Sequence, residues 1–328
     1  MYGYDIIGDV HGYADRLERL LRVMGYTRSG SGWRPPQGRL AIFAGDLINR
    51  GPGQLATCRI VRSMIDDGHA LAILGNHEVH AIGYGTSAPD AGADAWLRPR
   101  TAWSDRQHQA FLREVGCDSA LHRELIGWLR TLPLLLELGE PDCGIRVVHA
   151  WWDQASVDRL REMLPDGNLA SDQAVRLGLD GDSELAMVIE RLSRGQKIEL
   201  PIGCDFVDRR GLRHDVVWAR WWTEAPETLR DLAFIDDDQR DLVPDLPLPH
   251  GYQPTRIDGR PVFVGHYWMG GQPRPFSPKV ACVDWSAARG HPLIAYRWDG
   301  EASLTAGRFV SSEDQVPVAR RGVVVEYA

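Results

Sequence analysis

The sequence predicts an α/β protein, because short apolar segments alternate with amphipathic segments of helical period. With 44% hydrophobic and 25% charged residues, the 328-residue chain has the composition of an ordinary globular protein. Seven apolar runs end in polar turns that contain glycine, which is typical of strands. These runs are Tyr4–Ile7, Leu40–Ala44, Ala70–Leu74, Ile145–Val148, Pro261–Val264, Val280–Val283 and Pro292–Tyr296.

Amphipathic helices are expected between these strands. Asp15–Met24 carries apolar residues at the i, i+3, i+4 and i+7 positions, and Gly25 after it suits the end of a helix. Gln54–Asp67 has one apolar face and stops before Gly68, ahead of the third strand. The chain therefore begins with a predicted β-α-β unit. Further helical patterns cover Leu121–Leu132, Ser156–Leu164 and Ser183–Leu192.

Two segments interrupt the alternation and are predicted to be insertions. Residues 79–120 are rich in glycine, proline and small polar residues, which indicates a loop or a small-helix insertion. Residues 153–260 form a longer insertion, in which Asp236–Asp238 is expected to be a solvated loop because it lacks the spacing of a calcium site. We expect one domain over residues 1–328, with the two insertions forming a lid over the strand ends.

Charge, cysteine content and hydropathy disfavour several classes of protein. The formal net charge of −8 argues against a general binder of nucleic acid or anionic membranes, and long nucleic acids are not expected as partners. The five cysteines form no CxxC pair, so neither a disulfide framework nor a zinc ribbon is predicted. Since no apolar stretch of about 18 residues is present, we expect no membrane partner. An odd number of cysteines without a CxxC pair fits a reducing compartment, so we expect a cytoplasmic location.

Five short motifs place metal-binding side chains directly after apolar strands. Glycines in these motifs let the backbone turn sharply and approach an ion closely. Carboxylate, imidazole and amide oxygen together suit borderline or hard divalent ions better than a thiolate site would. Because ligands gather at the carboxyl ends of strands in open α/β sheets, the motifs predict one composite site. The motifs are Gly8–Gly12, Gly45–Gly51, Gly75–Glu78, Val148–Ala150 and Gly265–Tyr267.

The order GDVHG, GDLINRG, GNHE, VHA and GHY resembles the phosphoprotein phosphatase family of binuclear metallophosphoesterases. The likeness is to its bacterial branch, which is related to serine/threonine phosphatases and symmetrical dinucleoside-tetraphosphatases. It covers residues 4–83, 121–153 and 261–300, and gaps of 35 and 30 residues separate His11, Asp46 and Asn76. The resemblance implies a four-layer α/β/β/α sandwich, with two mixed sheets and lid insertions, that forms a single catalytic domain.

The resemblance also implies two divalent metal ions. Mn²⁺ is preferred, and iron, zinc or cobalt would be accepted by the same mixed ligand set. The first ion would be held by Asp9, His11 and Asp46. The second would be held by Asp46, Asn76, His149 and His266. Asp46 would bridge the pair, which would lower the pKa of a shared water and so produce a hydroxide nucleophile.

The remaining site residues follow from the same resemblance. His77 takes the place of the general acid that protonates the leaving oxygen. Arg50 and Arg220 resemble the phosphate-clamping arginines of the family, for which a planar guanidinium is well suited. Asn76 and Tyr267 are assigned with them to substrate binding. For Arg220, the alternative is a surface ion pair.

Asn49 departs from the family pattern, which has an aspartate that hydrogen-bonds the general-acid histidine. An amide oxygen can accept the imidazole N–H, but it cannot supply the negative charge that stabilises an imidazolium. We therefore expect a lowered pKa for His77, with Asn49 still part of the catalytic group. The result is either a working hydrolase, which the retained ligands favour, or an enzyme restricted to good leaving groups.

Large aromatic side chains surround two of the motifs. They could wall a groove that stacks a nucleobase or another flat group. Alternatively they pack in the core, which we favour because so many tryptophans must be buried. The residues concerned are Trp151, Trp152, Trp218, Trp221, Trp222 and Trp268.

The sequence thus predicts a metal-dependent phosphohydrolase that cleaves phosphate esters or anhydrides of a phosphorylated substrate by in-line attack. A phosphoprotein serine/threonine phosphatase and a nucleotide or dinucleoside-polyphosphate hydrolase both remain open. A pseudophosphatase that binds phosphorylated partners with little turnover is the alternative, and Asn49 supports it. A metal-dependent nuclease shares the chemistry, but the acidic net charge disfavours long polyanions as substrates.

Overall fold

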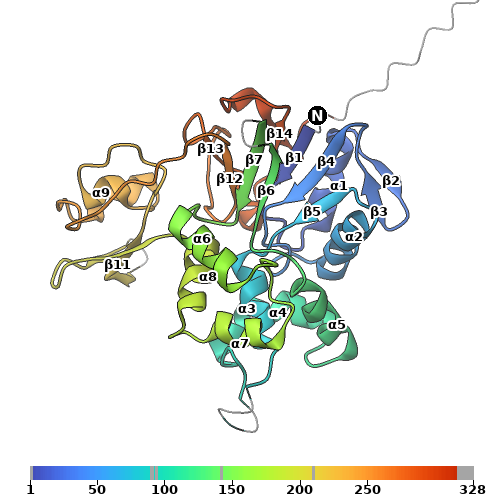
Figure 1. The fold of residues 1–328 in the computed structure, drawn as a ribbon, viewed down its shortest axis with the longest axis horizontal. Helices are drawn as coiled ribbons and strands as arrows, with labels where there is room; N and C mark the ends of the chain where they lie inside the picture. Colours follow the sequence, from blue (N-terminus) through green and yellow to red (C-terminus); the bar gives the residue numbers. More distant parts are fainter. Residues whose placement is uncertain (1–2, 89–91, 93–94, 141–142, 209–210, 316–328) are drawn as a thin grey trace, which may run out of the picture.

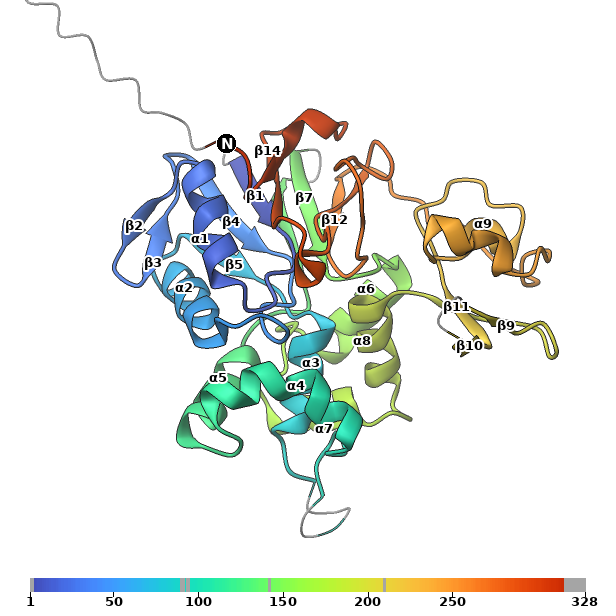
Figure 2. The same ribbon diagram turned by 180° about the vertical axis from the view of Figure 1, so that it is seen from behind.

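Two mixed sheets form the centre of the molecule in the computed structural model (Figures 1 and 2). The structure describes residues 3–88, 92, 95–140, 143–208 and 211–315. The first sheet has the order β15 (Phe309–Ser311), β14 (Ile294–Trp298), β1 (Gly3–Ile7), β4 (Arg39–Phe43) and β5 (Ala70–Ala72). The second has the order β13 (Val280–Cys282), β12 (Val262–Val264), β7 (Cys143–Val148) and β6 (Leu135–Glu140).

The two sheets pack against each other through alternate residues of their strands. Ile6 and Ile42 of the first sheet share one buried cluster with Val147 and Phe263 of the second. Their neighbours Ile7, Phe43, Val148 and Val264 belong instead to the larger cluster that contains the helices. This separation follows from the period of two along a strand, which sends successive side chains to opposite faces.

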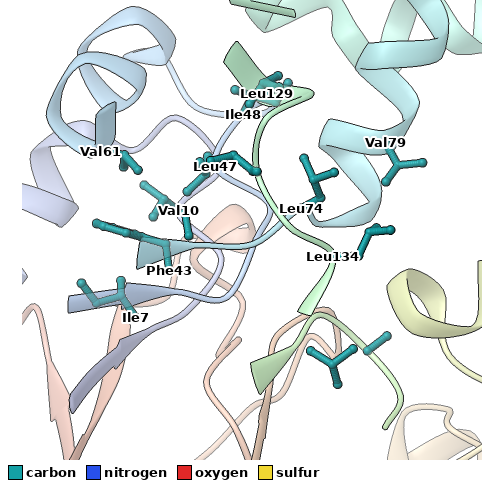
Figure 3. Packing of buried hydrophobic residues seen from close by; sticks show 14 of the residues in the cluster. Ile7, Val10, Phe43, Leu47, Ile48, Val61, Leu74, Val79, Leu129 and Leu134 are labelled. Atoms are coloured by element: carbon teal, nitrogen blue, oxygen red, sulfur yellow. The ribbon is translucent and has the colours of Figure 1, made fainter. Parts of the chain in front are cut away.

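Helices cover the outer faces of both sheets. On the first sheet, α1 (Ala14–Val23) and α2 (Gln54–Asp66) bury apolar stripes, and Figure 3 shows Val61 of α2 near Val10 and Phe43. Beside the second sheet lie α6 (Gln154–Met163) and α8 (Glu184–Arg194) (Figure 1). The predicted α/β/β/α layering is therefore confirmed. None of the helices in the described segments is long and apolar enough to span a membrane.

The first insertion is more helical than the sequence indicated. It contains most of α3 (Asn76–Tyr84) and a long helix, α4 (Ala102–Val115), before α5 (Ala120–Leu129). Helix α3 was not predicted because Gly83 and Gly85 disfavour a helix, but Gly85 in fact lies at the end of α3. The start of α4 could have been predicted from Thr101, a residue type favoured at helix N-caps. Thr101 accepts the Ser104 N–H in a capping box. The predicted loop between these helices falls partly outside the described residues.

The second insertion has two parts. Its first part contains α6, α7 (Asp172–Leu179) and α8, which pack into the main cluster. Its second part carries a separate small core and extends to one side of the sheets (Figure 2). The Asp236–Asp238 run is exposed there, as expected. The elements of this part are β8 (Lys197–Glu199), β9 (Phe206–Val207), β10 (Arg213–His214), β11 (Val216–Trp218), α9 (Leu229–Leu232) and a 3₁₀ helix at Asp237–Leu242.

All seven predicted strands are present, with boundaries close to those expected, as are the predicted helices. Strand β6, which pairs antiparallel with β7, was not predicted from the sequence. Its residues are half-buried and do not form a continuous apolar run. Other small elements are the hairpin β2 (Thr27–Ser29) and β3 (Gly32–Arg34), and 3₁₀ helices at Ala287–Arg289 and Ala306–Arg308.

Candidate active site

Four of the five sequence motifs line one cavity of about 470 Å³, and His149 of the remaining motif lies beside it, with its Nε2 3.4 Å from Oδ1 of Asp46. Each motif follows the end of a central strand, and the strands β1, β4 and β5 run parallel, so their carboxyl ends lie at the same edge. Strands β7 and β12 are likewise parallel. The cavity is lined by Asp9, His11, Asp46, Arg50, Asn76, His77, His80, Trp103, Gln107, Arg194, His266, Trp268, Asp284, Ser286, Ala288 and Arg289.

Backbone strain is concentrated at this edge. Among the described residues other than glycine, a positive φ occurs at seven positions, and five of them are predicted site residues. Such conformations cost of order 1–3 kcal/mol each and persist where the surrounding structure demands them. The strained site residues are His11 (φ 49°), Asp46 (50°), Asn49 (72°), Arg50 (75°) and His266 (64°).

Two glycines allow carboxylates to sit against the backbone. A Cβ on Gly75 would lie 2.2 Å from Oδ1 of Asp46, and a Cβ on Gly265 would lie 2.2 Å from Oδ1 of Asp9. Both contacts are far too short for any side chain. The glycines of the third and fifth motifs are therefore required by close approach, as the sequence analysis expected.

Asp46 lies at the centre of the cluster. Its Oδ2 is 3.7 Å from Nε2 of His11, and its Oδ1 is 3.4 Å from Nε2 of His149. Two groups of potential metal ligands share it, one with His11 and His77 and the other with Asp9 and His149. Although burial opposes ionisation, these histidines hold the pKa of Asp46 well below its usual range. The position fits a carboxylate shared by two cations.

Hydrogen bonds to backbone carbonyls orient two of the histidines. Nδ1 of His149 donates to the Ala44 carbonyl at 2.7 Å, and Nδ1 of His11 donates to the Ile48 carbonyl at 3.1 Å. These bonds place the proton on Nδ1 and leave Nε2 of each ring free to bind a cation. Nε2 is also the atom that faces Asp46 in both cases.

Asn76 and His266 complete the second predicted set of ligands. Oδ1 of Asn76 lies 3.1 Å from Nε2 of His149 and 2.9 Å from Nδ1 of His266. These three atoms therefore converge on one point next to Asp46. The structure brings together all six residues that the sequence assigned to metal binding.

The Asp9 carboxylate is the clearest sign that a cation belongs here. Its Oδ2 accepts the backbone N–H of His266 at 3.1 Å, whereas its buried Oδ1 has no hydrogen-bond partner. Burial, followed by the charges of Asp284 and Asp46, raises the pKa of Asp9 well above its ordinary value. An unpaired carboxylate oxygen among other buried carboxylates is costly unless a cation balances it. The donor set thus fits divalent metal ions.

Glu78 supports the site without lining the cavity. It is fully buried, and its carboxylate accepts four backbone N–H groups, from Asp46, Leu47, Ile48 and Gly75, at 2.7 to 3.2 Å. Glu78 therefore joins the second and third motifs. The sequence showed Glu78 in the GNHE motif but gave no indication of this role, which depends on the fold.

Asn49 contacts His77 as predicted, but through the opposite end of its amide. Its Nδ2 lies 2.8 Å from Nδ1 of His77, and its Oδ1 accepts from Nδ1 of His108 at 3.2 Å. The prediction that the amide oxygen accepts from His77 is corrected accordingly, because His108 occupies that oxygen. Burial lowers the pKa of His77 well below its ordinary value, against the opposing charge of Asp46.

The arginines at the cavity differ from those expected. Arg50 lines it and donates to Oε1 of Gln107 at 3.0 Å. Arg194 at the end of α8 and Arg289 also line it, although the sequence analysis did not single them out. Arg220 is not among the lining residues. Its backbone N–H donates to the Leu232 carbonyl, within the second part of the second insertion.

Tyr267 lies beneath the site and not within the cavity lining. Its side chain is buried, and its hydroxyl accepts from Nε1 of Trp221 at 3.1 Å. The ring also packs edge-on against Trp222, at 4.7 Å between centroids. This packing supports the loop that carries His266.

The tryptophans divide into buried and exposed groups. Trp151, Trp152, Trp221 and Trp222 are buried, in agreement with the favoured core-packing interpretation. Trp268 lines the cavity and is 36% exposed. Trp103 of α4 also lines the cavity and is 52% exposed, and no motif drew attention to it. Trp218 packs edge-on against His266 without lining the cavity.

Known proteins share this sequence pattern. The chain is 26% identical over 312 residues to the symmetrical bis(5′-nucleosyl)-tetraphosphatase of Nitrosococcus oceani, covering 90% of this chain and 92% of that relative. It is 35% identical over 144 residues to the symmetrical enzyme of Aromatoleum aromaticum, covering 44% of this chain and 42% of that relative. It is 43% identical over 74 residues to the asymmetrical bis(5′-nucleosyl)-tetraphosphatase PrpE of Halalkalibacterium halodurans. That match covers 23% of this chain and 30% of the relative's length.

The family assignment rests on a longer match. Residues 4–195, more than half of the chain, match the calcineurin-like phosphoesterase family. This range contains the first four motifs, and His266 of the fifth motif lines the same cavity as the first three. The chain therefore belongs to the calcineurin-like phosphoesterase family and is a metal-dependent phosphoric ester hydrolase.

Proposed function

We propose that this protein hydrolyses the phosphoanhydride bonds of nucleotides, with dinucleoside polyphosphates as the first candidates. The observation that carries the proposal is the presence of two exposed tryptophans, Trp103 and Trp268, in the lining of the metal-ligand cavity. Trp103 lies beside His80, and Trp268 lies beside His266. An exposed indole next to a phosphate site suits stacking of a nucleobase, worth about 1–3 kcal/mol per base.

The charged residues of the cavity suit a polyphosphate chain. Arg50, Arg194 and Arg289 offer planar guanidinium groups that can bind phosphate oxygens in pairs. Divalent ions held by the Asp46 cluster would polarise a phosphoryl oxygen and make a nearby water more acidic. His77 faces the same space and is placed to donate a hydrogen bond to the leaving oxygen. The names of the relatives, bis(5′-nucleosyl)-tetraphosphatases, support the same substrate class.

The other candidate functions have less support. A phosphoprotein phosphatase needs the same metals and arginines, but it gives no role to two exposed indoles at the cavity. A pseudophosphatase would not need the full set of six convergent ligands, nor the strained backbone at three of them, His11, Asp46 and His266.

A substrate panel tests the proposal. With Mn²⁺ added, we expect a higher kcat/KM for diadenosine tetraphosphate than for a phosphoserine peptide. Trp103→Ala and Trp268→Ala should each raise KM for diadenosine tetraphosphate about fivefold or more, the equivalent of 1 kcal/mol. Neither should change KM for inorganic tripolyphosphate, which has no base. Leu212→Ala, at an exposed residue outside the cavity lining, serves as the matched control. A preference for the phosphopeptide would refute the nucleotide proposal.

A further inference from the structure

We propose that His108 is a positioning residue that acts through Asn49 to hold His77 as the tautomer with hydrogen on Nε2. His108 lies on α4, so the first insertion would supply part of the catalytic apparatus. The role of His77 in donating a hydrogen bond to the leaving oxygen rests on the function proposed above. The hydrogen-bond chain does not depend on that function, so the chain and the function can be tested separately.

Four side chains form a continuous hydrogen-bonded chain that begins and ends at the cavity lining, with His77 and His80. His77 Nδ1 contacts Asn49 Nδ2 at 2.8 Å, and Asn49 Oδ1 contacts His108 Nδ1 at 3.2 Å. His108 Nε2 then contacts Nδ1 of His80. Asn49 is 0% exposed and His108 is 1% exposed, so water does not compete for these contacts.

The polarity of an amide determines the direction of this chain. The amide nitrogen can only donate, so His77 Nδ1 must accept and its hydrogen must be on Nε2. The amide oxygen can only accept, so His108 Nδ1 must carry a hydrogen. A neutral imidazole has one donor and one acceptor, so His108 Nε2 must then accept from His80. Every contact is satisfied when all three rings are neutral.

The surroundings keep the two distal rings neutral. Burial, followed by the charges of His80 and His122, lowers the pKa of His108 to about 3. Burial, followed by the charges of Arg98 and Arg194, lowers the pKa of His80 to about 4. A charged His108 would donate from both nitrogens, which would reverse the direction of its contact with His80.

The chain gives a physical reason for Asn49 in place of an aspartate. A carboxylate at this position could only accept, so it would require a hydrogen on Nδ1 of His77 as well as on Nδ1 of His108. A neutral His77 would then have no hydrogen on Nε2, the atom that faces Asp46 at 4.0 Å across the cluster. The amide keeps His77 neutral, with a hydrogen on Nε2 that can be donated in a hydrogen bond to the leaving oxygen.

Two isosteric substitutions of His108 separate positioning from packing. His108→Asn places an amide nitrogen where Nδ1 was and can still donate to Asn49. His108→Gln extends its amide to the position of Nε2, so it cannot donate to Asn49. We expect the Gln variant to lose about tenfold or more in kcat with phenyl phosphate, and clearly less with p-nitrophenyl phosphate, whose leaving group needs little protonation. KM should change little, and the Asn variant should recover most of the loss.

The second measurement reads the tautomer directly. Imidazole ¹⁵N spectra of the histidine-labelled protein, loaded with diamagnetic Zn²⁺, should show His77 with hydrogen on Nε2. The His108→Gln variant should show a mixture of tautomers. Signals assigned by comparison with His77→Gln make this readout independent of turnover, so it stands even if no phosphatase activity is found. A wild-type His77 with hydrogen on Nδ1, or equal losses with the two aryl phosphates, would overturn the proposal.

Discussion

Asp9 and His266 are joined by a single hydrogen bond, from the His266 backbone N–H to Asp9 Oδ2 at 3.1 Å, which leaves Oδ1 buried and unpaired. The charge on that carboxylate is therefore unbalanced within the protein, since Asp46 and Asp284 both raise its pKa further. Metal binding should consequently be coupled to stability.

Adding Mn²⁺ should raise the melting temperature of the metal-free protein. Binding at a hundred times Kd would contribute about 2.7 kcal/mol. Asp9→Asn should remove most of this increase, yet it should leave the metal-free protein at least as stable as wild type, because it removes a buried unpaired charge. Thermal unfolding with chelator and with Mn²⁺ measures both effects. The exposed Asp182→Asn is the control, and an unchanged Mn²⁺ response in Asp9→Asn would contradict the ligand assignment.

Asp46→Asn should lower turnover by several orders of magnitude and reduce bound metal to one ion or none. The reason is that Asp46 is shared by both groups of potential ligands. Metal analysis together with aryl phosphate turnover provides the measurement. Two retained ions with near-normal activity would exclude a bridging role.

The sequence could predict that the proposed metal ligands lie together, because each is within a few residues of a strand end. Asp9, Asp46 and His149 needed only the correct strands and the rule that parallel strands end at the same edge. Arg194, Trp103 and His108 could not be found in this way. They belong to helices of the insertions, whose placement over the strand ends depends on tertiary packing and not on a local pattern.

The orientation of the Asn49 amide is a second feature that could not be predicted from the sequence. The motif alone indicated a contact with His77, and that contact is present. Which end of the amide makes it depends on His108, which lies 59 positions away in the sequence. Arg220 is the opposite case, because the family resemblance suggested a phosphate clamp and the fold places Arg220 outside the cavity lining.

We expect Arg194 to contribute more to phosphate binding than Arg220. Arg50→Ala and Arg194→Ala should raise KM and lower kcat together, since a guanidinium pair with phosphate strengthens as charge develops. Arg220→Ala should leave kcat/KM within about twofold of wild type. Steady-state kinetics of the Arg194→Ala and Arg220→Ala variants with a nucleotide substrate measures the two contributions. A larger effect at Arg220 than at Arg194 would restore the assignment made from sequence.

Glu78→Gln should destabilise the protein and weaken metal binding. Glu78 receives four backbone N–H groups from the loops that carry Asp46 and Asn76. The amide NH₂ of glutamine would face donors, and each buried group left unpaired costs about 1–3 kcal/mol. Urea unfolding and Mn²⁺ titration measure the two effects. Unchanged stability would show that the loops hold their positions without this carboxylate.

The stability of the metal-free protein should fall as the pH is lowered through the range between 6.5 and 3. His108 has an ordinary pKa of 6.5 when unfolded and a pKa of about 3 in the folded chain, because burial and its neighbours His80 and His122 disfavour its charge. The unfolded chain therefore binds more protons below pH 6.5, so the contribution is complete above that pH and is lost as the pH falls towards 3. At pH 5 the loss from His108 amounts to about 2 kcal/mol.

His108→Asn isolates this contribution, because asparagine does not titrate and keeps the bond to Asn49. Urea unfolding at pH 7.5 and pH 5, with chelator present throughout, gives the free energy of unfolding for both proteins. Between the two pH values, the free energy of unfolding of the variant should fall by about 2 kcal/mol less than that of wild type. If the two proteins lose the same amount, His108 either is not neutral in the folded chain or is less buried than its 1% exposure indicates. The direction of the hydrogen-bond chain from His80 to His77 would then have to be reconsidered.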